Sequence, residues 1–172
     1  MIIYKDILTG DELISDAFNL KEVDNILWEV DCRNITVGDD NIQLEGANPS
    51  AEAEDEDAGA GNAEQVLDIK YNFRLNDYPK LEKEEYKKAI RGYMKKVLAK
   101  LEEKKAPAET IKEFKDNAQT ALKRILANYK DYDVLVGEHF SADSMHILIN
   151  YREDGITPYA TFWKHGLEEM KV

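Results

Sequence analysis

One long segment, Leu81 to Tyr129, has unbroken helical periodicity, and strand-like sequence lies on both sides of it. In its first arm, apolar residues recur at steps of three and four, so they share one face of an α-helix. These residues are Tyr86, Ala89, Ile90, Tyr93, Met94, Val97, Leu98 and Leu101. The second arm repeats the pattern after Pro107, a residue that the first turn of a helix tolerates. Because the connection is short, we predict an antiparallel helical hairpin over residues 81–130.

The polar side of this hairpin differs in charge from the rest of the chain. Residues 81–130 contain 14 Lys and Arg against 8 Asp and Glu, whereas the remainder contains 9 against 27. Lys and Glu are common on the solvated face of any helix, so part of this pattern needs no functional explanation. The segregation of sign also indicates a docking face for an acidic partner. The candidate residues are Lys87, Lys88, Arg91, Lys95, Lys96, Lys100, Lys123 and Arg124, and Lys112 and Lys115 continue the pattern.

Composition excludes several other classes of protein. The chain has 172 residues, of which 43% are hydrophobic, so it can bury one core as a single domain over residues 1–172. Its net charge of −12 argues against general nucleic-acid binding. The sequence lacks both a membrane-spanning apolar run and a signal-peptide pattern, so we expect a cytoplasmic protein. The single cysteine, Cys32, permits no internal disulfide and no thiolate zinc site, and we expect it to be buried.

Outside the hairpin, the pattern predicts strands. The clearest runs from Leu67 to Leu75, where apolar and polar residues alternate strictly. The other predicted strands cover residues 2–7, 26–30, 35–37, 42–44, 132–136, 145–151 and 158–163. Strands before and after a helical insertion, without alternation of strand and helix, predict an antiparallel α+β domain.

An acidic segment lies between two of these strands. From Glu45 to Asp68 there are eight acidic residues and no basic one, with many Ala and Gly between them. Such a composition buries too little apolar surface to offset the entropy lost on ordering. We therefore predict a flexible acidic loop over residues 45–66.

The sequence lacks the patterns that carry common enzyme chemistry. It has no Gly-rich phosphate loop, and the run Gly59 to Gly61 lacks the third glycine of a dinucleotide site. The three histidines, His139, His146 and His165, have no helix-type metal spacing. No nucleophile is flanked by a recognisable base, and no pair of carboxylates stands out as a general acid and base. We therefore predict that the protein is not an enzyme.

Several ordered segments resemble the translationally controlled tumour protein (TCTP) family from end to end. They are Met1 to Asp6, Gly10 to Leu13, Gly46 to Glu52, Gly137-Glu138, Asn150 to Tyr159 and Lys164 to Glu168. The resemblance implies a mixed, mainly antiparallel β-tent (Mss4-like) domain with an inserted α-helical hairpin. The zinc-holding cysteine pairs of related Rab exchange factors are absent, so no zinc is expected. Many animal members end in Cys, whereas this chain ends in Val172, so we expect a monomer.

The resemblance also implies functions. It implies a multi-partner binding protein linked to tubulin and microtubules, translation elongation factors, growth control and apoptosis regulators. Two alternatives are nucleotide exchange on a Ras-like, specifically Rheb-like, GTPase through Glu12, and an acidic chaperone-like domain without a single partner. The residues themselves favour another role for Glu12, since Asp11 and Glu12 would cap a helical turn over Leu13 to Phe18.

Calcium binding is a further implication of the resemblance. The residues concerned are Asn48, Glu52, Glu138 and Asp143. Because the sequence lacks the twelve-residue loop that supplies oxygen ligands in strong sites, we expect weak binding and no required cofactor. The alternative is that these acidic residues attract only a diffuse cloud of counterions.

Overall fold

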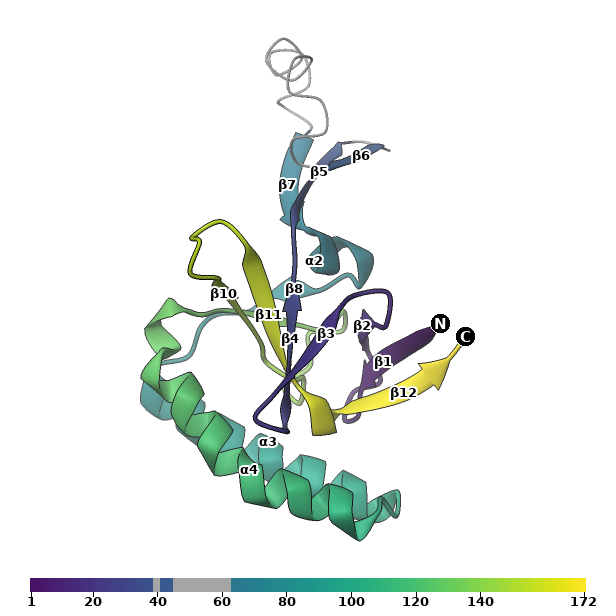
Figure 1. The fold of residues 1–172 in the computed structure, drawn as a ribbon, viewed down its shortest axis with the longest axis vertical. Coiled ribbons are helices and arrows are strands. Elements are labelled where there is room, and N and C mark those ends of the chain that lie inside the picture. The colour runs from purple at the N-terminus through teal and green to yellow at the C-terminus, as the bar shows by residue number, and fades with distance from the viewer. Residues whose placement is uncertain (39–40, 45–62) are drawn as a thin grey trace.

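The computed structural model describes residues 1–38, 41–44 and 63–172. In these residues a helical hairpin is inserted between strands that precede and follow it, and it lies along one end of the sheets (Figure 1). Every strand pair in the described part of the chain is antiparallel. The predicted α+β class with antiparallel sheets is therefore confirmed.

The largest sheet has six strands in the order β3-β4-β11-β10-β9-β8. Their bounds are β3 (Leu20–Val23), β4 (Leu27–Asp31), β11 (Pro158–Trp163), β10 (Ile147–Tyr151), β9 (Asp133–Val136) and β8 (Asn76–Asp77). A second sheet, β12-β1-β2, joins the two ends of the chain. It consists of β12 (Leu167–Lys171), β1 (Ile2–Asp6) and β2 (Glu12–Ser15). Its β1–β12 pairing brings the termini together, and the Val172 N–H donates to the Met1 carbonyl at 3.0 Å.

The third sheet, β6-β5-β7, projects away from the helical hairpin (Figure 1). It contains β5 (Asn34–Gly38), β6 (Asn41–Leu44) and β7 (Ala63–Leu67). The strands predicted over residues 35–37 and 42–44 are confirmed, and they form a hairpin in which Gly38 pairs with Asn41. The predicted flexible loop is wrong at its end, because residues 63–66 pair with β5 as part of β7. The rest of that loop, residues 45–62, lies outside the described residues.

The strand predicted from Leu67 to Leu75 is wrong. Residues of this segment form a short helix, α2 (Asp68–Asn72), in which Ile69 is fully buried and Phe73, four residues on, packs on the same side. Tyr71, which a strand would bury with them, is 43% exposed. Arg74 then adopts a positive φ of 56°, and the Leu75 N–H donates to the Lys70 carbonyl at 3.0 Å. This hydrogen bond satisfies a carbonyl at the end of the helix, as in a Schellman motif.

The helical turn predicted over Leu13 to Phe18 is also wrong. Glu12 begins strand β2, which pairs with β1, so neither Asp11 nor Glu12 caps a helix there. Leu13 and Ile14 are both fully buried although they point to opposite faces of the strand. Burial on both faces leaves no polar–apolar alternation, which is the signal that identifies a strand in a sequence.

The predicted helical hairpin is confirmed as α3 (Lys83–Glu103) and α4 (Ala108–Ala127), followed by the 3₁₀ turn η1 (Tyr129–Asp131). Pro107 is the residue immediately before α4. Eleven residues of the two predicted stripes are buried: Tyr86, Ile90, Met94, Val97, Leu101, Phe114, Ala118, Ala121, Leu122, Ile125 and Tyr129. Ala89, predicted in the stripe, is exposed. The buried stripe residues belong to one hydrophobic core that also contains the buried residues of the sheets. Cys32 lies in this core, so its predicted burial is confirmed.

Polar contacts join the hairpin to the sheets at several points. Glu113 on α4 accepts hydrogen bonds from Lys164 at 3.0 Å and from His165 at 2.9 Å, both in the 3₁₀ turn η2 (Lys164–Gly166). Farther along α4, Arg124 pairs with Asp24 at 3.2 Å. Exposed ion pairs are each worth about 0–1 kcal/mol, so the buried apolar stripes supply most of the stabilisation.

Candidate functional site

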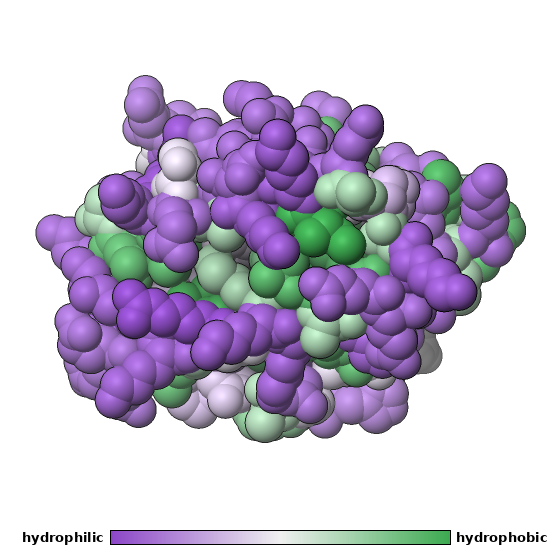
Figure 2. All heavy atoms as spheres, turned by 90° about the horizontal axis from the view of Figure 1, so that it is seen from below, coloured by the Kyte–Doolittle hydropathy of each residue, from purple (hydrophilic) through white to green (hydrophobic). Residues whose placement is uncertain are grey.

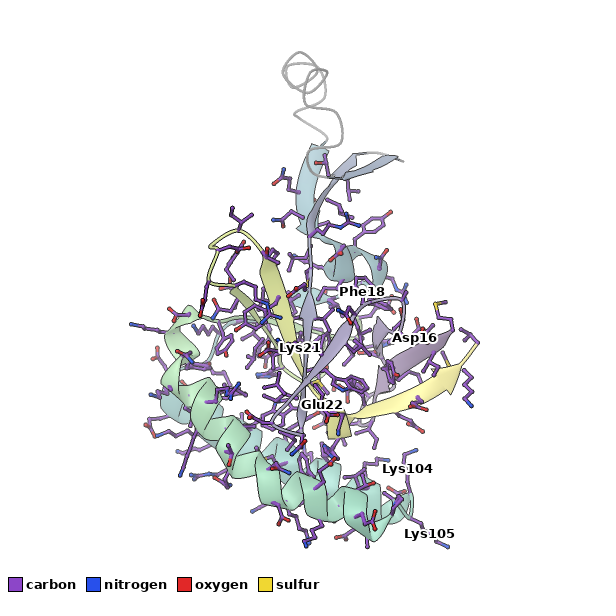
Figure 3. The ribbon with its side chains drawn as sticks, viewed as in Figure 1. Asp16, Phe18, Lys21, Glu22, Lys104 and Lys105 are labelled. Carbon is purple, nitrogen blue, oxygen red and sulfur yellow. The ribbon has the colours of Figure 1, made fainter. Side chains whose placement is uncertain are left out.

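The outer face of the hairpin is mainly hydrophilic. Figure 2 views the molecule from the hairpin side and shows charged and polar side chains over most of the surface, with apolar groups exposed in a band between them. Lys104 and Lys105 stand at the turn between α3 and α4, at the tip of the hairpin (Figure 3). Of these two, Lys104 forms an ion pair with Glu168 of β12 at 2.9 Å.

Four of the eight predicted basic residues are neutralised by neighbouring carboxylates. Two pair within α3: Lys87 with Glu84 at 3.1 Å and Lys100 with Glu103 at 3.4 Å. The other two reach outside the hairpin, where Lys96 pairs with Asp143 and Arg124 with Asp24. These cations are therefore less available to an outside partner than their sequence positions suggest.

The other four predicted cations, Lys88, Arg91, Lys95 and Lys123, form no ion pair with any residue that the structure describes. Three of them, Lys88, Arg91 and Lys95, follow one another on α3 at steps of three and four and are exposed. Residues at this spacing lie on the same side of a helix, about 5–6 Å apart at their Cβ atoms. We refer to Lys88, Arg91 and Lys95 as the α3 basic stripe.

Glu12 lies in a second polar cluster, at the start of β2. Its carboxylate is 3.9 Å from the guanidinium of Arg74, and Arg74 also pairs with Glu138 at 2.9 Å. The side chain of Glu12 is 36% exposed. Sequence analysis missed Arg74, because it lies 62 residues from Glu12 and becomes a neighbour only through the turn that follows α2.

The neighbouring Asp11 fixes the loop beside this cluster. Its buried carboxylate accepts a hydrogen bond from the His139 N–H at 3.2 Å and contacts the His139 ring through Nδ1. The Asp11 carboxylate accepts a hydrogen bond from the His139 ring, and this contact raises the pKa of His139. Gly137 packs directly on the Asp11 side chain, so a larger residue there would collide with it. Asp11 thus holds Glu138 beside Glu12, a structural role in place of the predicted helix cap.

The residues predicted to bind calcium are not brought together in the described part of the chain. Glu138 is paired with Arg74 and Asp143 with Lys96, while Asn48 and Glu52 lie outside the described residues. Among residues 1–38, 41–44 and 63–172, no three His, Cys, Asp or Glu side chains form a group that could hold a metal ion. The weak calcium site therefore stays a prediction.

The fold and these surfaces define an α+β protein with an inserted helical hairpin and exposed charged side chains, and no helix in the described ranges could cross a membrane. A family model, the translationally controlled tumour protein, matches residues 1–168. The chain belongs to this family.

Several named relatives show how far the similarity extends. A translationally-controlled tumor protein homolog of Aspergillus oryzae is 91% identical, and that of Saccharomyces cerevisiae is 45% identical, each over 100% of both chains. Among solved structures, the translationally controlled tumor-associated protein of Schizosaccharomyces pombe matches with a TM-score of 0.78 and 47% identity over 100% of both chains. The Caenorhabditis elegans protein of the same family matches with a TM-score of 0.69 and 31% identity, covering 100% of this chain and 99% of that one.

Proposed function

We propose that this chain is a non-enzymatic cytoplasmic binding protein, and that its α3 basic stripe binds acidic segments of partner proteins, with the tubulin tails of microtubules as the leading case. Translation elongation factors and apoptosis regulators are further proposed partners, which would link the protein to protein synthesis and growth control. The observation that carries this proposal is the row of three exposed cations without a carboxylate partner in the described residues.

The negative charge of the rest of the molecule does not prevent such binding. At physiological ionic strength, charges are screened over about 8 Å, so a partner that contacts the stripe senses mainly the nearby cations. More distant acidic surfaces would instead orient the partner and exclude other docking positions.

Charge reversal tests this proposal. The triple variant Lys88→Glu, Arg91→Glu and Lys95→Glu should weaken microtubule co-sedimentation by about tenfold or more, since each exposed pair contributes about 0.2–1 kcal/mol and reversal adds repulsion. The control triple variant is Lys83→Glu, Lys105→Glu and Lys130→Glu, which makes the same change in net charge elsewhere on or near the hairpin. Binding by the unsubstituted protein should also fall steeply with added salt.

Two results would reject the stripe as the binding surface. One is unchanged co-sedimentation of the stripe variant. The other is an equal loss in both triple variants, which would indicate only non-specific attraction between net charges.

A second candidate function is regulation of a Ras-like GTPase by Glu12. The position of Glu12 favours this function. Glu12 is the first residue of strand β2 and does not cap a helix, and its partly exposed carboxylate lies at the edge of a sheet. A carboxylate in such a position could compete for the Mg²⁺ ion or the phosphate-binding lysine of a GTPase and so release nucleotide. The likeness to Mss4-like exchange factors is part of this proposal.

The rate of GDP release from a Rheb-like GTPase tests the role of Glu12. Glu12→Gln should abolish the acceleration while leaving the melting temperature nearly unchanged, because its contact with Arg74 is long and exposed. Glu138→Gln removes another charge from the same cluster and should retain the acceleration. If the unsubstituted protein does not accelerate GDP release, this function is excluded.

A further inference from the structure

Near its tip, the helical hairpin contacts the sheets through a small cluster of polar side chains. Glu113, in the first half of α4, accepts hydrogen bonds from Lys164 at 3.0 Å and from His165 at 2.9 Å. Lys164 also forms an ion pair with Glu22 of β3 at 2.9 Å. The carboxylate of Glu113 is therefore shared between two neighbouring residues of η2. Of these two, only His165 has a side chain that changes its charge near neutral pH.

The ring of His165 is buried between the hairpin and the sheets. Its side chain is 2% exposed, and its ring lies 5.3 Å from that of Phe114, centroid to centroid. Because Nε2 lies beside the carboxylate of Glu113, Nε2 carries the proton of the neutral ring and donates this hydrogen bond. The other nitrogen, Nδ1, is buried and has no hydrogen-bond partner in the described part of the chain. A second proton would therefore bind at an atom that has no acceptor beside it.

The charged groups around the ring act in opposite directions. The carboxylates of Glu113 and Glu22 attract a positively charged ring, whereas the ammonium group of Lys164 repels it. The two carboxylates are 38% and 47% exposed, so water screens their attraction, while a charged ring at this position would lose nearly all of its hydration. Burial and the charge of Lys164 lower the pKa of His165 below its ordinary value of 6.5.

α3 also contacts this part of the sheets. Its residue Tyr93 places its hydroxyl against Gly166 of η2, and burial raises the pKa of that hydroxyl well above its ordinary value, so it stays neutral. At the end of α3, Lys104 pairs with Glu168 of β12 at 2.9 Å, and both are charged at neutral and mildly acidic pH. Among the described groups at this contact, His165 is thus the one whose charge responds to mild acid.

We propose that His165 is an acid-sensitive switch that controls the attachment of the hairpin tip to the sheets. The neutral ring holds the tip through its hydrogen bond to Glu113 and its packing on Phe114. In mild acid, Nδ1 takes up a proton from solvent, and the charged ring is more stable in water than between α4 and η2. The tip then separates from the sheets more often and exposes the apolar side of α4 around Phe114. This switch goes beyond the proposed docking of acidic proteins, because it does not use the α3 basic stripe.

Hydrogen exchange of backbone amides in the full chain measures this separation. Protection factors, which correct for the direct effect of pH on exchange, are compared at pH 7.5 and pH 5.5 for residues 111–118. Opening should increase by up to about tenfold at the lower pH, because the opened state takes up one proton below a pKa of about 6.5. His165→Gln keeps an N–H donor for Glu113 but has no titratable ring, so its opening should be nearly independent of pH in this range.

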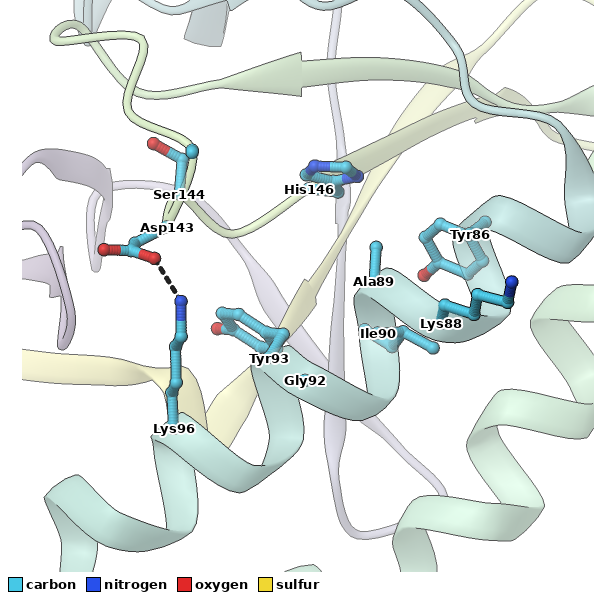
Figure 4. Close-up of a pocket in the computed structure, with 11 residues that line it drawn as sticks. Tyr86, Lys88, Ala89, Ile90, Gly92, Tyr93, Lys96, Asp143, Ser144 and His146 are labelled. Atoms are coloured by element: carbon cyan, nitrogen blue, oxygen red, sulfur yellow. Dashed lines mark hydrogen bonds and ion pairs between the residues drawn. The ribbon is translucent and has the colours of Figure 1, made fainter.

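His146→Gln is the matched control, because burial lowers the pKa of His146 as well. Figure 4 shows His146 facing Tyr86 and Ala89 of α3, in the wall of a cavity of about 240 Å³ between α3 and the loop before β10. Loss of this ring removes one titratable group at a different contact of the hairpin. The acid-induced opening of residues 111–118 should therefore remain in His146→Gln.

Titration of the His165 ring by NMR tests the proposal without any substitution. A midpoint below pH 6.5 in the folded protein supports the switch, and a midpoint at or above 6.5 overturns it. The proposal is also overturned if His165→Gln opens in acid as much as the unsubstituted protein, or if His146→Gln abolishes the opening. None of these results depends on whether the protein binds microtubules.

Discussion

Phe114→Ala is expected to lower the free energy of unfolding by about 3–5 kcal/mol, the range for removal of a buried aromatic side chain. Phe114 is 1% exposed on α4, and its ring packs 5.3 Å from that of His165, which precedes β12. The substitution therefore leaves a cavity where the helical hairpin meets the C-terminal part of the sheets. Equilibrium unfolding in urea measures the change.

Phe140→Ala is the matched control, because Phe140 is 48% exposed and lies in a loop. Its only aromatic neighbour in the described residues is Tyr78, at 5.3 Å, so its loss should cost about 1 kcal/mol or less. Equal losses in the two variants would contradict the conclusion that buried packing attaches the hairpin. A broadened, multi-step transition in Phe114→Ala alone would show that the hairpin separates before the sheets unfold.

The hairpin could be predicted because its signal is local. In α3 and α4, apolar residues recur at steps of three or four, and the buried positions from Tyr86 to Ile125 follow that spacing. Residues 67–75 show how the same reasoning fails. Apolar residues at alternate positions include a pair four apart, Ile69 and Phe73, so the pattern fits one helical turn as well as a strand. Nine residues are too few for periodicity alone to choose between them.

The strands that were missed depend on distant partners. β12 pairs with β1 across almost the whole chain, with Ile2 opposite Lys171, and its sequence of mixed charged and apolar residues has no clear alternation. Residues 63–66 of β7 continue the composition of the acidic loop, although the pairing of β7 with β5 supplies backbone hydrogen bonds. Neither local propensity nor composition reports such long-range pairing.

The basic surface was predictable in location but not in detail. The excess of Lys and Arg in residues 81–130 locates this surface on the hairpin. Whether each basic side chain is free to bind a partner depends on acidic side chains elsewhere in the fold. Lys96 meets Asp143 across 47 residues and Arg124 meets Asp24 across 100. The same folding that neutralises these two leaves the α3 basic stripe without ion pairs in the described residues. Tertiary contacts decide which of these cations are paired, so the local sequence around each one does not distinguish the two groups.

Asp6 gives the second large prediction, because one buried carboxylate joins two distant parts of the chain. It is 1% exposed, and it accepts hydrogen bonds from the Leu8 N–H at 2.9 Å and the Met145 N–H at 2.8 Å. Asp6→Ala should lower the free energy of unfolding by about 2–6 kcal/mol, since it leaves two backbone N–H groups without their acceptor and each such group costs about 1–3 kcal/mol.

Asp16→Ala is the matched control for Asp6→Ala in urea unfolding at pH 7. Asp16 accepts one hydrogen bond, from the Ile2 N–H at 3.1 Å, at an exposed position, so its loss should cost about 1 kcal/mol. Equal losses in the two variants would contradict the role of Asp6.

A second test of Asp6 uses pH. Burial raises the pKa of Asp6, so the folded state binds the proton of the Asp6 carboxyl group more tightly than the unfolded chain does. The contribution of Asp6 to stability must then decline as pH rises through the window above its ordinary pKa of 3.8. The stability difference between the unsubstituted protein and Asp6→Ala should therefore be larger at pH 4.5 than at pH 7, and the opposite trend would show that folding lowers this pKa.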